Sequence, residues 1–153
     1  RGPVLIVGRR LGPLKETCAS DSHGNIRSIA ADVSTPEGRA AIMAAVKENE
    51  SVSALVHNAG TLMPVKPLAE VREEEWRSAM ATNVDAPLFL TQAVLPRMTR
   101  GGRILHISSG AAKSAYQGWG AYCVTKAGFN MMYRVLAKEL EPRGIYVGSV
   151  RPG

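Results

Sequence analysis

Short runs of apolar residues alternate along the chain with longer stretches in which apolar residues recur every three or four positions. Runs rich in valine and isoleucine that end near glycine, proline or asparagine are typical of β-strands. Such runs predict five strands, at residues 4–7, 26–31, 52–57, 103–108 and 145–150. The longer stretches predict helices at residues 35–49, 73–98 and 119–140, with the second disturbed near Pro87. This alternation predicts an α/β fold: a doubly wound parallel sheet with helices on both faces.

The size and composition of the chain fit one globular domain. Of its 153 residues, 45% are hydrophobic and 21% are charged, which predicts a packed core and excludes a disordered or fibrous class. No repeat, low-complexity tract or linker interrupts the pattern, and no apolar run approaches the roughly 18 residues of a membrane span. We therefore expect residues 1–153 to form a single domain without a membrane partner.

The net charge of +6 raises the question of a nucleic-acid partner. The basic residues are scattered, with Arg9 and Arg10 as the densest cluster, and aromatic residues make up only 5% of the chain, too few for stacking on bases. Positive charge also suits a bound polyphosphate, so we expect no nucleic-acid binding. Cys18 and Cys123 lack the spacing of metal ligands and fit reduced thiols of a cytoplasmic protein, so no metal is expected either.

Tyr122 and Lys126 form the first candidate for chemistry. They are four positions apart, so on a helix their side chains lie on one face. An ammonium close to a phenol favours the phenolate, and a tyrosine tuned in this way can protonate a carbonyl oxygen or deprotonate an alcohol. A solvated helix face is the alternative interpretation of this pair when it is taken alone.

Two serines follow the strand predicted at residues 103–108. Ligand sites in open parallel sheets lie beyond the carboxyl ends of the strands, where Ser109 stands. The loop that follows is long enough to bring Tyr122 back beside Ser109, whose hydroxyl could hold a substrate carbonyl oxygen. For Ser108 we favour a hydrogen bond that caps the strand end.

Together, Ser109, Tyr122 and Lys126 at these spacings resemble the active site of the short-chain dehydrogenase/reductase family. Asn83, in the predicted long helix, matches that family's helical asparagine, and the likeness extends over essentially the whole chain. The resemblance implies a Rossmann-like fold and catalysis by Ser109, Tyr122, Lys126 and Asn83. In it Tyr122 protonates the carbonyl oxygen, Ser109 orients that oxygen, and Lys126 holds the nicotinamide ribose.

The same resemblance implies a set of cofactor contacts. Asn58, Ala59 and Gly60 after a strand resemble the family's Asn-Ala-Gly turn, which lies along the cofactor. Asp32 and Val33 resemble the segment that contacts the adenine, and the final Pro152 and Gly153 resemble the turn near the nicotinamide. With Arg9, Tyr122 and Lys126, these residues complete the predicted cofactor site.

Asn83 also has an interpretation in terms of backbone geometry. In an α-helix its carbonyl would accept from the amide of residue 87, but Pro87 has no amide hydrogen. The Asn83 carbonyl is then left free. The resemblance implies that it binds a water that links Lys126 to solvent as a proton relay, while a plain proline kink is the structural alternative.

Arg9 bears on the choice of cofactor. An acidic group after the first strand of a dinucleotide fold suits the ribose hydroxyls of NAD, whereas an arginine suits the 2′-phosphate of NADP. No Asp or Glu lies between Val4 and Leu14. This favours NADP over NAD, with a surface arginine at the start of a helix as the alternative.

The family's glycine-rich phosphate loop does not occur in this sequence. The segment around Gly8 and Gly12 has the wrong spacing and matches the family's second strand. We therefore expect the sequence to be part of a longer chain that also supplies a substrate-covering segment after Gly153. A polypeptide of exactly this extent is expected not to fold stably by itself, because its sheet would have open edges.

The sequence thus predicts an NADP(H)-dependent oxidoreductase that acts on a small-molecule carbonyl or alcohol. The alternative is a non-catalytic NADP-binding regulatory protein on the same fold, against which the intact set of site residues argues. His57 and His106 stand at strand positions and are expected to be packed histidines. The resemblance alone implies a homodimer or homotetramer.

Overall fold

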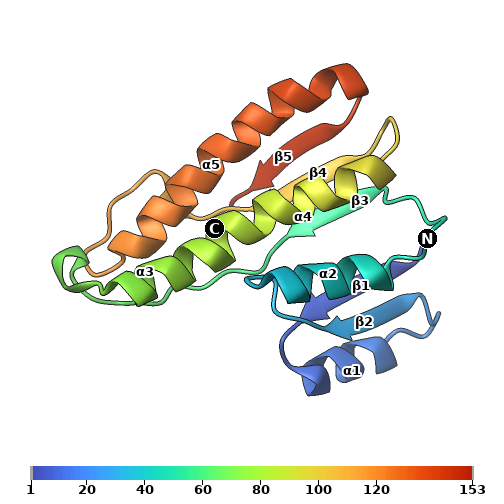
Figure 1. Cartoon of the computed structure of the whole chain (residues 1–153), viewed down its shortest axis with the longest axis horizontal. Coiled ribbons are helices and arrows are strands. Elements are labelled where there is room, and N and C mark those ends of the chain that lie inside the picture. The colour runs from blue at the N-terminus through green and yellow to red at the C-terminus, as the bar shows by residue number, and fades with distance from the viewer. Residues whose placement is uncertain (1, 153) are drawn as a thin grey trace. The chain divides into compact units, whose positions relative to one another are not determined.

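The computed structural model describes residues 2–152, and the chain divides into two compact units. One unit ends at Glu50 and the other begins at Ser51. Both consist of parallel strands connected by helices (Figure 1). The α/β fold class predicted from the sequence is confirmed.

In the N-terminal unit, β1 (Val4–Gly8) pairs in parallel with β2 (Ile26–Ala30) through the crossover helix α1 (Leu11–Ala19). Leu14 is the buried residue of this helix, and a β-carbon added at Gly8 would lie 3.6 Å from its side chain. The apolar side of α1 therefore covers the carboxyl end of β1.

Helix α2 (Pro36–Ala45) begins where the sequence predicts and ends earlier. Thr35 caps it by accepting a hydrogen bond from the Gly38 amide, and Pro36 occupies the first turn, where its missing amide hydrogen costs nothing. The expected end near residue 49 is wrong because Val46 is extended and residues 47–50 form a turn. Glu50 stabilises that turn by accepting from the Lys47 amide and from Arg27 of β2.

The C-terminal unit contains a three-stranded parallel sheet in the order β3-β4-β5. Its strands are β3 (Ala54–His57), β4 (Arg103–Ile107) and β5 (Tyr146–Val150). The register places His57 beside His106 and His106 beside Ser149. The strand expected from residue 52 starts two residues later because the Val52 amide bonds to the carbonyl of Arg97 instead.

The long helix predicted at residues 73–98 is interrupted. It consists of α3 (Glu73–Met80), a π-helical turn (Ala81–Asp85), α4 (Ala86–Val94) and a final 3₁₀ turn (Leu95–Arg97). The Ala86 amide reaches back five residues to the carbonyl of Ala81, one more than in an α-helix. Because Pro87 lacks an amide hydrogen and its ring crowds the preceding turn, the expected disturbance takes this form.

Helix α5 (Gly120–Leu140) packs against β5, while α4 packs against β3. The π turn contacts α5, so α5 runs beside the interrupted helix (Figure 1). A left-handed glycine, Gly144, ends the 3₁₀ turn that follows α5 and leads into β5. This arrangement brings the π turn, the end of β4 and the first turns of α5 together.

Candidate active site

Tyr122 and Lys126 lie in the first two turns of α5. The Lys126 Nζ atom is 5.6 Å from the centroid of the Tyr122 ring, as expected for neighbours on one helix face. Lys126 is only 7% exposed, and its Nζ donates a hydrogen bond to the Ile107 carbonyl at the end of β4, at 3.0 Å. Burial lowers the pKa of the Lys126 ammonium below its ordinary value. The pair is therefore not a solvated helix face.

Within residues 2–152, the Ile107 carbonyl is the one hydrogen-bond acceptor of Lys126. An ammonium has three donors, so two remain available to a ligand or to water. Gly60 lies close to them, since a β-carbon added there would be 3.7 Å from the Lys126 Nζ and 3.4 Å from the Asn83 Oδ1. The absence of a side chain at Gly60 keeps this space open.

Asn83 is 2% exposed and joins three segments. Its Oδ1 accepts from the Thr61 amide at 2.8 Å, and its Nδ2 donates to the Thr61 carbonyl at 2.8 Å and to the Thr125 Oγ1 at 3.0 Å. The Thr125 hydroxyl in turn donates to the carbonyl of Tyr122 at 2.9 Å. The side chain of Asn83 thus ties the loop after β3 to the turn of α5 that carries the Tyr–Lys pair.

Sequence reasoning missed Thr61 and Thr125 as members of this network. Thr125 stands between Tyr122 and Lys126, and Thr61 directly follows the Asn-Ala-Gly turn. Both are adjacent to residues that the sequence did single out. Their partner is distant in sequence, however, and only the fold brings it close.

Ser109 follows β4 and is half-buried. Its hydroxyl accepts a hydrogen bond from the Ala111 amide at 3.2 Å and so caps the short 3₁₀ turn Gly110–Ala112. This bond caps the 3₁₀ turn, and it is not the strand-end cap expected of the Ser108 side chain. The Ser108 amide instead continues the sheet by bonding to the Val150 carbonyl at 2.7 Å.

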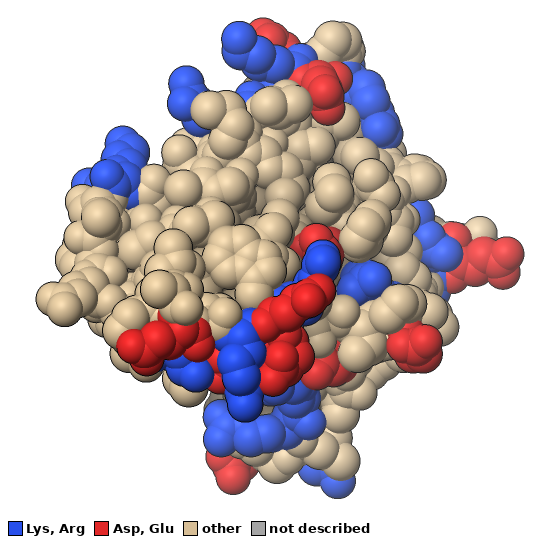
Figure 2. All heavy atoms as spheres, turned by 60° about the vertical axis from the view of Figure 1, so that its left-hand side comes forward, with Lys and Arg blue, Asp and Glu red and all other residues tan. Residues whose placement is uncertain are grey.

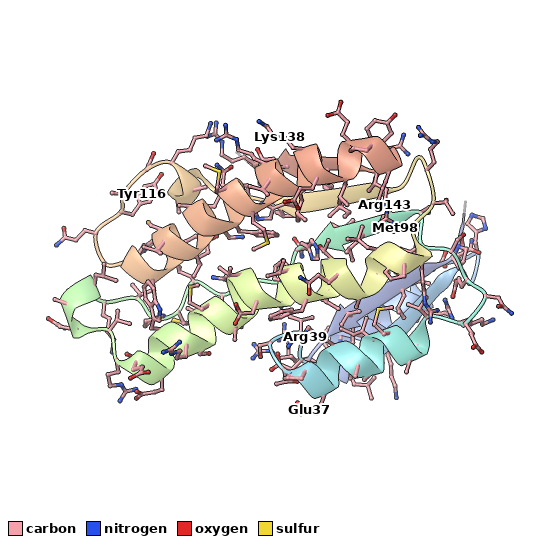
Figure 3. The ribbon with its side chains drawn as sticks, turned by 45° about the horizontal axis from the view of Figure 1, so that its top comes forward. Glu37, Arg39, Met98, Tyr116, Lys138 and Arg143 are labelled. Carbon is pink, nitrogen blue, oxygen red and sulfur yellow. The ribbon has the colours of Figure 1, made fainter. Side chains whose placement is uncertain are left out.

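An aromatic group adjoins Tyr122 at the start of α5. The Trp119 ring lies 6.0 Å from the Tyr122 ring at a steep angle, and the Tyr116 ring lies 5.2 Å from Trp119. Figure 3 shows Tyr116 on the loop that leads into α5. These rings form an aromatic cluster beside Tyr122.

Asn58, Ala59 and Gly60 are exposed at the carboxyl end of β3. Pro152 is exposed after β5, and Gly153 lies outside the described residues. The turn after β3 therefore presents open backbone beside the buried lysine.

The N-terminal unit holds the other three predicted cofactor residues. The Asp32 carboxylate accepts from the hydroxyl of Ser34 at 2.6 Å and from its amide at 2.9 Å. These bonds, more than the nearby charge of Arg9, hold the pKa of Asp32 below its ordinary value. Arg9 is exposed after β1, and the Val33 carbonyl accepts from Arg39 at 2.9 Å.

His57 and His106 are packed histidines, as the sequence predicts. His57 is 8% exposed and shares a 2.9 Å hydrogen bond with the hydroxyl of Thr91. His106 is 1% exposed, and its ring centroid lies 3.6 Å from that of Phe129. Among the described residues, no cluster of side chains has the composition of a metal site.

Charge and helix length add two findings. On the face shown in Figure 2, acidic and basic side chains are interspersed. Ion pairs in the C-terminal unit include Lys66–Glu75 and Arg72–Glu75. Across residues 2–152, no helix combines the length and the apolar character of a membrane span.

A family model for short chain dehydrogenases matches residues 2–153. The chain belongs to the short-chain dehydrogenase family. It is 40% identical over 102 residues to a benzil reductase of Bacillus cereus that forms (S)-benzoin, a match that covers 64% of this chain and 41% of the relative. It is 32% identical over 154 residues to an uncharacterised oxidoreductase of Schizosaccharomyces pombe, covering 100% of this chain and 61% of the relative.

Solved structures of family members have the same fold. The closed form of a serine dehydrogenase complexed with NADP⁺ superposes with a TM-score of 0.88 at 27% identity, covering 99% of this chain and 62% of that one. This short-chain dehydrogenase sequence thus spans about half the length of the relatives that it matches.

Proposed function

We propose that the full-length protein is an oxidoreductase that transfers a hydride between NADP(H) and a carbonyl or alcohol substrate by Ser-Tyr-Lys chemistry. The observation that carries this proposal is the buried ammonium of Lys126 beside the Tyr122 ring, with two donors left over. A buried cation with unused donors is costly unless it serves a bound group.

The residues present fit a nicotinamide dinucleotide. The turn of Asn58, Ala59 and Gly60 is exposed, so its backbone is open to contact with the dinucleotide. Because Gly60 has no side chain, the dinucleotide can approach Lys126. Pro152 and Gly153 would border the nicotinamide. The bound cofactor supplies the hydride that reaches, or leaves, the substrate carbon.

The chain's own residues then have three tasks. Ser109 holds the substrate oxygen through its hydroxyl, and Tyr122 donates a proton to that oxygen or takes one from it. Lys126, whose Nζ lies beside the Tyr122 ring, holds the ribose hydroxyls with its remaining donors. Reprotonation of Tyr122 would pass through Lys126 to a water on the carbonyl of Asn83, which belongs to the π turn.

For the cofactor we propose NADP rather than NAD. Arg9 is exposed just beyond β1, and no carboxylate lies between Val4 and Leu14 to bind unphosphorylated ribose hydroxyls. Asp32 would meet the adenine and Val33 would lie against it. The NADP⁺ complex of the related serine dehydrogenase is compatible with this choice.

The remaining parts of the proposal concern the whole protein. Both units would belong to one dinucleotide-binding domain spanning residues 1–153, in a cytoplasmic protein. A homodimer or homotetramer is favoured by large apolar side chains exposed on α4 and α5, namely Phe89, Val124, Met131 and Val135.

The competing function is a non-catalytic NADP-binding regulator on the same fold. Such a protein needs the cofactor contacts but has no use for the proton donor. To separate the two, the full-length protein is mixed with NADPH or NADH and a panel of aromatic, cyclic and acyl carbonyl compounds, and loss of absorbance at the reduced nicotinamide band is followed.

The oxidoreductase proposal expects turnover of at least one carbonyl compound, faster with NADPH than with NADH. Tight NADPH binding without turnover of any compound would instead support the regulator. Equal affinity for NADPH and NADH would contradict the role given to Arg9.

A further inference from the structure

A polar cavity of about 200 Å³ opens beside Ser109, on the side of the C-terminal unit where β4 and β5 end. Besides Ser109 it is lined by Lys113 of the following loop, by Asn130 and Tyr133 of α5, and by Ser149 and Arg151 at the end of β5. At roughly 30 Å³ per water, this volume holds a small polar group rather than a large ring system.

The charges around this cavity all have one sign. Lys113 and Arg151 line it, and no Asp or Glu does. Both are exposed, and neither forms an ion pair with a carboxylate within residues 2–152. By contrast, three basic residues each form an ion pair at 3.3 Å or less with a glutamate of α3, namely Lys66, Arg72 and Arg77.

The sequence extends this asymmetry over a long segment. Between Asp85 and Glu139 there is no carboxylate, while the same segment contains Lys113, Lys126 and five other basic residues. The loop and the part of α5 as far as Lys138, which form both the Tyr–Lys pair and the cavity, therefore contain basic residues and no carboxylate. A concave site lined in this way attracts and orients anions.

The hydroxyl and amide groups of the cavity complement the two cations. Ser149, Asn130 and Tyr133 all offer hydrogen-bond donors to an oxyanion, and an arginine fork matches the two oxygens of a carboxylate or phosphate. Ser109 borders the cavity and also belongs to the proposed reaction centre. A substrate whose carbonyl oxygen meets Ser109 can thus place an attached anionic group between Lys113 and Arg151.

We propose that this cavity is a subsite for an anionic group, a carboxylate or a phosphate ester, on the carbonyl substrate. This inference rests on the proposed oxidoreductase function and specifies the class of substrate. Lys113 and Arg151 are specificity-determining residues in it, and they take no part in the proton transfer.

The kinetic test uses the full-length protein with NADPH and three substrates that share one ketone: a short oxo acid, its methyl ester and a phosphorylated analogue. We expect one of the anionic compounds to exceed the ester in kcat/KM by about tenfold or more, and the preferred anion identifies the natural group. Arg151→Gln and Lys113→Gln should each raise KM for that anion about tenfold and leave the ester unchanged.

Lys138→Gln is the matched control. It removes one exposed cation from the last turn of α5, away from the loop that carries Tyr116 (Figure 3), and Lys138 does not line the cavity. Its kinetic constants should equal those of the wild type. If all three variants lowered anion turnover equally, general charge steering and not a subsite would be at work, and the proposal would be overturned.

Direct binding separates failure of the subsite from failure of the proposed function. The oxo acid and the phosphorylated analogue are titrated by calorimetry into the wild-type protein and into Arg151→Gln, both with NADP⁺ present. Weaker binding to the variant supports the subsite even if no compound is reduced. Equal binding to both proteins, or no binding, overturns the subsite even if neutral ketones are reduced well.

Discussion

At the scale of single residues, the Asn83 side chain holds together the network beside the Tyr–Lys pair. It is buried in the π turn, and its amide group satisfies both the amide and the carbonyl of Thr61 as well as the hydroxyl of Thr125. A buried polar group left without a partner costs more than its hydrogen bond contributes when made. The side chain of Asn83 therefore stabilises the site and also fixes its geometry.

Replacement of Asn83 by leucine should lower the free energy of unfolding by about 2–4 kcal/mol, because it leaves polar groups on two other segments without a hydrogen-bond partner. Urea unfolding measures this loss. Thr82→Ala is the control, since it removes only a bond to the Ser78 carbonyl within the same helix and should cost about 0.5 kcal/mol or less. Equal losses in the two variants would contradict the network.

His57 and His106 make the stability of the C-terminal unit depend on pH. They lie side by side on β3 and β4, and desolvation by burial lowers the pKa of each to about 4, with the charge of Lys126 adding to the effect at His106. Both are therefore neutral in the folded protein at pH 6. The unfolded chain takes up protons below about pH 6.5, so folding opposes protonation there.

We expect stability to be complete above about pH 6.5 and to fall by a few kcal/mol between that pH and about pH 4. Urea unfolding at pH 7.5, 6 and 5 measures the slope. His106→Phe should flatten the slope, because the ring packing on Phe129 is kept while one titrating group is removed. An unchanged slope in this variant would show that other groups control the acid sensitivity.

At the level of elements, the first turn of α2 lies unusually close to the backbone of Asp32. A β-carbon at Gly38 would overlap the carbonyl oxygen of Asp32, while the Gly38 amide is already bonded to the hydroxyl of Thr35. Neither contact can relax without moving the start of the helix. Glycine is therefore required here because there is no room for a β-carbon, and not because of its backbone torsion angles.

Gly38→Ala should accordingly lower the midpoint of thermal unfolding, at a cost of about 1–3 kcal/mol for the forced backbone shift. Gly12→Ala in α1 is the matched control, because a β-carbon there meets nothing within 4 Å. That control should be neutral or stabilise the protein by up to about 1 kcal/mol. If both variants behaved alike, the close approach to Asp32 would be refuted.

An element boundary can be predicted from the sequence when neighbouring residues determine it, and not when a partner distant in sequence does. The five strands, the start of α2 and the disturbance at Pro87 follow from local chemistry, and all occur in the structure. The early end of α2 at Ala45 and the late start of β3 at Ala54 do not follow from it. There, partners distant in sequence, Arg27 for Glu50 and Arg97 for Val52, decide the boundary.

For the whole molecule, the sequence indicated the family and the residues of the Tyr–Lys pair, because both depend on fixed spacings. It did not indicate Thr61 or Thr125, whose roles arise from contact with the distant Asn83. It assigned strand-end capping to the Ser108 side chain, whereas the structure shows the Ser109 hydroxyl capping the 3₁₀ turn that follows. A sequence pattern indicates which residues share a face, but not which hydrogen bonds their hydroxyl groups form.

The cofactor preference is a property of the assembled protein and can be tested at Arg9. Arg9→Asp should raise KM for NADPH by about tenfold to a hundredfold and lower it for NADH, since a carboxylate repels a 2′-phosphate and accepts from a ribose hydroxyl. Arg10→Asp is the neighbouring control and should leave the ratio of the two constants close to the wild-type value. A larger shift in the control would assign the phosphate contact to Arg10.

The central claim is that Tyr122 exchanges the proton with the substrate. The most direct measurement compares kcat of the full-length wild type, Tyr122→Phe and Tyr146→Phe for NADPH-dependent carbonyl reduction. Tyr146 is exposed on β5, so its variant controls for the general effect of losing a phenol. We predict a fall of about a hundredfold or more for Tyr122→Phe and no change for Tyr146→Phe. Full activity of Tyr122→Phe would contradict the account and assign the proton donor elsewhere.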